Sequence, residues 1–60
     1  MIGDKVRIIN PIDWDGRKFV PAFMFYTVMK TKHKSPMIWI GKDEKILHAM
    51  HEDDIEIIHE

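Results

Sequence analysis

Turn residues divide the chain into short apolar stretches rich in β-branched and aromatic side chains, a pattern typical of β-strands. Residues 5–9 form the first stretch. Asn10 and Pro11 end it, because proline has no backbone donor and disfavours helix at the residue before it. Four further stretches follow, at residues 23–32, 37–40, 45–50 and 55–58. The sequence therefore predicts an all-β protein with five short strands.

The connections between these stretches differ in length. Residues 10–22 form a long first loop, and a loop of this length in so small a domain is usually functional. Residues 32–36 and 41–44 predict tight hairpin turns, the second with Gly41 available for a positive φ. Residues 51–54 predict a single 3₁₀ turn, because short carboxylates there can accept the free amides.

Residues 43–51 allow two interpretations. The spacing of Ile46, Leu47 and Met50 fits a helical turn about as well as a strand. We favour a strand, because the preceding turn is short and Trp39 needs a covered antiparallel neighbour.

Sixty residues without a cysteine predict one domain that folds without disulfides or thiolate-bound metal. The chain is 45% hydrophobic and 32% charged, a globular composition that argues against disorder. No apolar run approaches the roughly 18 residues of a membrane span, and the first residues lack a signal-peptide pattern. We therefore expect a cytoplasmic protein that does not engage a membrane.

The two ends of the chain resemble a known fold. Residues 3–8 (Gly-Asp-Lys-Val-Arg-Ile) resemble the first strand of the SH3-like barrels in the photosystem I accessory subunit, the variable chain of ferredoxin–thioredoxin reductase, and small bacterial and phage proteins. Residues 51–58 resemble the acidic turn and last strand of these barrels. The resemblance implies a five-stranded SH3-like barrel with a long first loop, a 3₁₀ turn before the last strand, and no exposed edges. Residues 20–28 depart from this family, since aromatic and methionine side chains replace its common glycine-containing turn.

Apolar side chains are concentrated in and just after the first loop: Trp14, Phe19, Val20, Phe23, Met24 and Phe25. They either plug the end of the barrel or form a surface for a partner. We favour the partner surface, because aromatic residues, Met and Arg are enriched in protein interfaces. The anchors would be Trp14, Phe19, Phe23 and Phe25, and the polar rim would be Arg17 and Lys18.

The preferred function is therefore a non-catalytic protein-binding module, whose partner is another protein or a second copy in a homodimer. The resemblance adds that small free-standing barrels of this kind are common among phage and mobile-element proteins that bind and modulate a host protein. A structural accessory subunit of a larger complex is a further alternative.

A KOW-like nucleic-acid-binding module is the rival from another class, with Lys30, Lys32 and Lys34 gathered on one hairpin. The net charge of −1 argues against binding led by bulk charge. Seven Lys or Arg and three Asp stand in residues 1–34, whereas residues 35–60 hold two Lys and seven Asp or Glu. Nucleic acid is therefore the less favoured partner.

Four histidines suggest a metal site, with His48 and His51 three residues apart and His33 and His59 elsewhere. Zinc requires three or four converging ligands, and these histidines are expected on different elements, so we expect no bound metal. The chain has one serine, Ser35, and no phosphate-binding glycine-rich motif. We therefore expect neither catalysis nor a cofactor.

Overall fold

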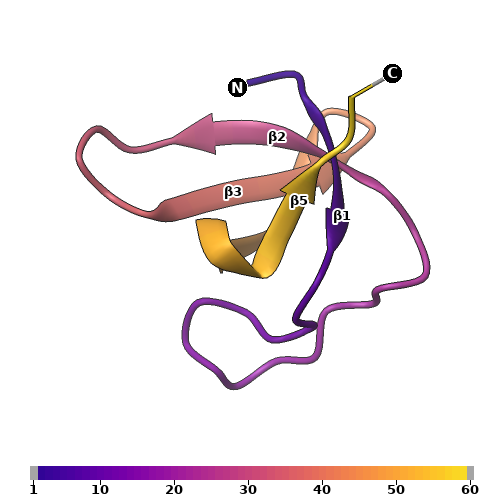
Figure 1. Cartoon of the computed structure of the whole chain (residues 1–60), viewed down its shortest axis with the longest axis vertical. Helices are drawn as coiled ribbons and strands as arrows, with labels where there is room; N and C mark the ends of the chain where they lie inside the picture. Colours follow the sequence, from indigo (N-terminus) through magenta and orange to yellow (C-terminus); the bar gives the residue numbers. More distant parts are fainter. Residues whose placement is uncertain (1, 60) are drawn as a thin grey trace.

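The computed structural model describes residues 2–59 and is an all-β structure of five antiparallel strands (Figure 1). Its elements are β1 (Lys5–Ile8), β2 (Tyr26–Thr31), β3 (Met37–Lys42), β4 (Lys45–His51), the single 3₁₀ turn η1 (Glu52–Asp54) and β5 (Ile55–Ile57). The strands form one sheet in the order β4-β3-β2-β1-β5. The predicted all-β class, the five strands and the 3₁₀ turn before the last strand are confirmed. The helical interpretation of residues 43–51 is wrong.

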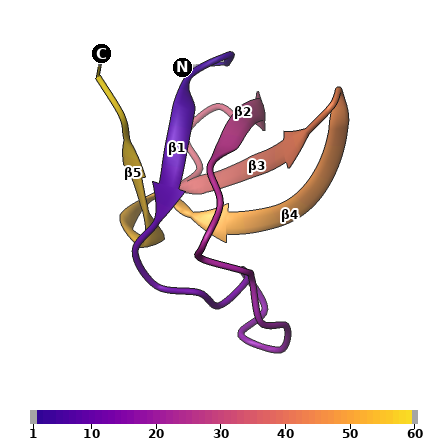
Figure 2. The same cartoon turned by 90° about the vertical axis from the view of Figure 1, so that its right-hand side faces the viewer.

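The predicted closure into a barrel without exposed edges is wrong, because the five strands form one open sheet. Its edges are β4 and β5, and within residues 2–59 no ladder joins these two strands. β5 has three residues, all paired with β1, and η1 connects β4 to β5, which lie at opposite edges of the sheet (Figure 2). Bulges between Val28 and Lys30 and between Ile40 and Gly41 bend the sheet without closing it.

The core lies on one face of this bent sheet. Within residues 2–59, nine hydrophobic side chains are buried: Val6, Ile8, Val20, Tyr26, Val28, Ile38, Ile40, Met50 and Ile55. Most follow the strand period of two, as in β1, where Val6 and Ile8 point inward and Lys5 and Arg7 outward. Tyr26 and Val28, two residues apart on one face of β2, are both buried. Val20 is the one core residue contributed by the first loop.

The second strand is shorter than predicted, because it begins at Tyr26 and leaves residues 23–25 outside the sheet. β2 pairs with β1 at Tyr26 and Thr27, and the Tyr26 hydroxyl donates to the Pro21 carbonyl at 2.9 Å. This hydrogen bond holds Pro21, which precedes β2 by five residues, against the first residue of β2. The prediction that residues 23–25 lie in a strand is therefore wrong.

The hairpin between β3 and β4 uses a different residue for its positive φ than predicted. Asp43 (φ 51°) and Glu44 (φ 66°) adopt the left-handed conformation of a two-residue turn. Gly41 is required for another reason, since a Cβ there would overlap the Lys45 carbonyl oxygen.

Candidate partner-binding surface

The first loop lies beyond the end of the sheet, away from the two termini (Figures 1 and 2). Inside it, Ile12 and Phe19 form an isolated antiparallel bridge, and the Val20 N–H donates to the Pro11 carbonyl at 2.9 Å. Residues 11–20 therefore double back as a small hairpin rather than an open loop. The Val20 side chain fixes one leg of this hairpin in the core.

The turn of this hairpin is organised by the Asp13 carboxylate. It accepts the backbone N–H of Arg17 at 3.0 Å and of Lys18 at 3.3 Å. Desolvation raises the pKa of Asp13, but the backbone hydrogen bonds from Arg17, Lys18 and Gly16 and the charge of Lys18 together outweigh it, so the pKa is lowered from its ordinary value. The side chains of Arg17 and Lys18 are exposed at this turn.

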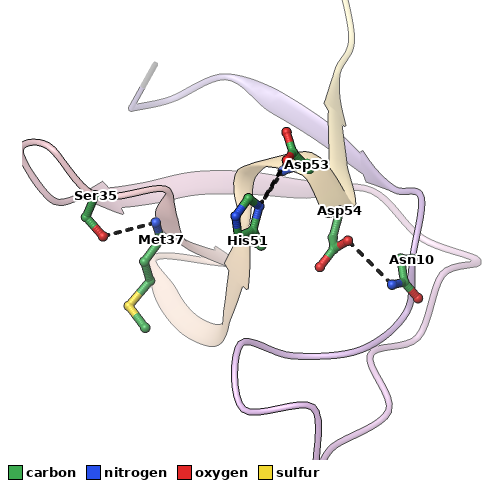
Figure 3. A network of polar contacts seen from close by, with 6 residues as sticks. All are labelled: Asn10, Ser35, Met37, His51, Asp53 and Asp54. Atoms are coloured by element: carbon green, nitrogen blue, oxygen red, sulfur yellow. Dashed lines mark hydrogen bonds and ion pairs between the residues drawn. The ribbon is translucent and has the colours of Figure 1, made fainter.

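Trp14 attaches the loop to the edge of β4. Its backbone N–H donates to the Ala49 carbonyl at 2.7 Å. Its ring stacks on the His51 ring, with centroids 5.6 Å apart and planes 8° from parallel. The Nδ1 atom of His51 accepts the N–H of Asp53 at 3.0 Å, which fixes the imidazole at the start of η1 (Figure 3).

The four predicted anchors differ in exposure. Phe23 is 87% exposed and Phe19 is 73% exposed, whereas Phe25 (48%) and Trp14 (40%) are partly covered. Val20 and Met24, which belong to the same apolar group, pack into or against the core. The group therefore divides between the two interpretations. Val20 and Met24 fill the end of the core, and the Phe side chains remain at the surface.

Phe25 lies apart from the loop hairpin. The Lys5 Nζ atom stands 4.9 Å from the centre of its ring, next to a shallow hollow where β1, β2 and the β3–β4 turn meet. The anchors therefore contact different elements, with Trp14 on β4 and Phe25 against Lys5.

The basic hairpin between β2 and β3 contains one contact that the sequence reading missed. The Lys30 Nζ atom lies 5.1 Å from the centre of the Trp39 ring. Lys32 and Lys34 are exposed, and Lys34 adopts a positive φ of 57° in the turn. The alternation along β3 could have predicted that Trp39 lies on the face opposite the core, because its neighbours Ile38 and Ile40 point inward.

The histidines take separate positions. His48 lies edge-on to the Tyr26 ring at 5.7 Å, while His51 stacks on Trp14. Within residues 2–59, no three His, Asp or Glu side chains converge to hold a metal ion. The same residues include no helix with the length and apolarity to cross a membrane.

Comparison of the chain with models of protein families, with curated proteins and with solved structures finds no match.

Proposed function

We propose that this chain is a non-catalytic protein-binding module whose contact region is the first loop with the segment leading into β2. The observation that carries the proposal is the exposure of Phe19 and Phe23 on a segment that is otherwise held in place. Val20 anchors the loop in the core, and the Asp13 carboxylate and the Trp14–Ala49 hydrogen bond fix its course. Aromatic side chains are enriched in protein interfaces relative to the rest of the protein surface.

A held loop favours binding because its conformational entropy is lost on folding rather than on association. Immobilising flexible side chains and loops costs part of the interaction energy, and a preorganised surface reduces that cost. Aromatic side chains suit such a surface, since they supply large contact area with few rotatable bonds. The exposed charges of Arg17 and Lys18 at the turn would form the polar rim that sets the orientation of the partner.

An SH3-like relationship is part of this proposal. It is supported by the strand count, the long first loop and the 3₁₀ turn before β5. A host protein is the class of partner that the resemblance to phage and bacterial SH3-like proteins suggests testing first.

The test compares the wild type with a Phe19→Ser/Phe23→Ser double variant. Proteins from the native host would be captured on each and identified by mass spectrometry, and the leading partner would then be purified and titrated. We expect the double variant to bind more weakly by about 2 kcal/mol or more, which is about thirtyfold. Leu47→Ser is the matched control, since Leu47 is 48% exposed but lies on β4. Equal binding by the double variant and the wild type would refute the proposal.

The contact between Lys30 and Trp39 favours one second candidate, a single-stranded nucleic-acid-binding module. A cation beside an aromatic ring is a common feature of surfaces on which bases stack and phosphates bind. Binding of an oligonucleotide that weakens steeply with salt, and that Lys30→Ala with Lys32→Ala and Lys34→Ala abolishes, would support this function.

A further inference from the structure

The face of the sheet opposite the core carries an aromatic surface assembled from four segments. Met50 and Ile40 point into the core, so their neighbours along β4 and β3 point to the other face. Lys30 pairs with Trp39 and Trp39 with Ala49, so these three stand side by side across β2, β3 and β4. We call the full set the tryptophan face, and its members are Trp14, Lys30, Met37, Trp39, Ala49 and His51.

The first loop extends this face by one position beyond β4. The backbone N–H of Trp14 donates a hydrogen bond to the Ala49 carbonyl, as a residue of a further strand beside β4 would. The Trp14 ring stacks on the ring of His51, and His51 pairs with Met37 of β3. Ala49 thus separates two tryptophans with the smallest side chain of the set. Both tryptophans, Met37 and His51 keep part of their surface open to solvent.

Such a composition is unusual for a sheet face that faces water. Solvated faces of antiparallel sheets normally carry polar side chains, and tryptophan and methionine are among the residues most enriched in interfaces. Within residues 2–59, no second layer packs over this face. The sheet bends so that β1 and β5 lie toward its opposite face, which is the core face (Figure 2). The surface is therefore suited to a partner.

The charges at the two sides of the face have opposite sign. Lys30 stands on the β2 side, and Lys32 and Lys34 follow in the adjoining hairpin. On the other side β4 runs into η1, where the Asp53 side chain is 85% exposed and its Oδ2 atom lies 3.6 Å from the Nδ1 atom of His51 (Figure 3). A polyanion crossing the face would pass from lysines to carboxylates, which disfavours nucleic acid.

We propose that the tryptophan face is the interface of a twofold-symmetric homodimer. A twofold axis brings the same patch of two copies together in opposite directions, so the basic side of one copy meets the acidic side of the other. The face fits this operation, because Lys30 and Asp53 lie on opposite sides of it and would each oppose the other in the second copy, while Trp39 and Ala49 lie in the middle. An acidic peptide would complement only the lysine side.

The dimensions of the molecule are sufficient for this interface. A stable association buries about 800 Å² per partner, which is about a fifth of the 4392 Å² accessible surface of the chain. The whole molecule measures 29 by 29 by 20 Å along its principal axes. The proposal does not rest on the proposed function. The two surfaces share Trp14, but Phe19 and Phe23, which carry the proposed function, are not part of this face.

Sedimentation equilibrium over a wide range of protein concentrations tests the proposal. We expect the mass to rise from 7.2 kDa toward twice that value. Trp39→Thr and Ala49→Lys should each raise the dimer dissociation constant by about tenfold or more. Both positions lie off the core, and amide spectra would verify that each variant is folded. A wild type that stays monomeric, or a dimer that survives both substitutions, would overturn the proposal.

Reversing the charges of Lys30 and Asp53, singly and in a mixture, distinguishes a homodimer from a complex with any other partner. Lys30→Glu and Asp53→Lys should each weaken the homodimer, because each creates two like-charge pairs. A mixture of the two variants should dimerise again, since each copy then supplies the charge that the other needs. Failure of the mixture to associate, with both variants folded, would reject the twofold arrangement. The Phe19→Ser/Phe23→Ser variant should dimerise normally, which keeps this test distinct from that of the proposed function.

Discussion

Phe19 and Val20 are adjacent in the first loop and have opposite burial, so truncating each tests how the loop is anchored. Val20→Ala removes two methyl groups from a side chain that is fully buried. At about 0.8 kcal/mol per buried carbon plus a cavity term, the free energy of unfolding should fall by about 2–3 kcal/mol. Phe19→Ala removes a larger side chain, but Phe19 is 73% exposed, and the change should stay within about 0.5 kcal/mol.

Thermal unfolding followed by circular dichroism measures both effects. A domain of this size shifts its Tm by about 4–8 °C per kcal/mol, so Val20→Ala should lower the Tm by about 8–24 °C and Phe19→Ala by less than about 4 °C. The total stability of such a domain is about 3–9 kcal/mol, which leaves Val20→Ala folded enough to measure. Val28→Ala is the matched core control and should behave as Val20→Ala does, because Val28 is equally buried.

The reasoning would be refuted if Phe19→Ala cost as much as Val20→Ala. That result would mean that Phe19 is a core plug in solution, and the exposed surface on which the proposed function depends would not exist. A neutral Val20→Ala would refute it from the other side, since the loop would then lack its anchor.

Three further predictions concern single contacts. Tyr26→Phe removes the hydroxyl that donates to the Pro21 carbonyl and should lower the free energy of unfolding by about 1 kcal/mol in a urea titration. The pKa of Asp13 is lowered from 3.8, so the contribution of its carboxylate to the stability of the loop is present above that pH and is lost as the pH falls through the folded-state pKa. Amide exchange at Arg17 should follow this acid transition, and Asp13→Asn should abolish it. Gly41→Ala should destabilise the β3–β4 hairpin by about 1–3 kcal/mol in thermal melts, because the added Cβ overlaps the backbone of β4.

The strands were predictable where one face is apolar and the other is polar. In β1 the alternation fixes both the strand and its buried residues, Val6 and Ile8. Residues 23–25 are apolar on both faces, so the pattern could not mark where β2 begins. Tyr26, the first residue of β2, donates a hydrogen bond to the Pro21 carbonyl, a contact that no local pattern encodes.

Barrel closure was not predictable for a related reason. Whether β4 and β5 pair depends on the bend of the whole sheet and on the direction in which η1 sends the chain. The bulge between Val28 and Lys30 contributes to that bend and has no signature in the sequence.

The burial of the candidate site residues was likewise predictable only where they lie in a regular strand. Phe19 and Val20 are equally apolar neighbours in a segment without periodicity, so the sequence could group them but could not tell which one is buried. Trp39, by contrast, sits between two buried isoleucines in a regular strand, and its outward direction follows from the period of two. From the sequence we expected Trp39 to need a covered antiparallel neighbour, and the tryptophan face was therefore not predicted.

The position of Lys30 bears on the choice between protein and nucleic acid. As part of a basic hairpin, Lys30 favours a phosphate backbone. In the structure its ammonium lies against the Trp39 ring, on a surface whose other side ends in the carboxylates of η1. A phosphate backbone carries one charge per nucleotide and cannot omit the charges that would face Asp53, whereas a protein surface can place acidic and basic side chains at opposite sides. The arrangement of charge around the two tryptophans therefore favours a protein partner, even though the lysines taken alone favour nucleic acid.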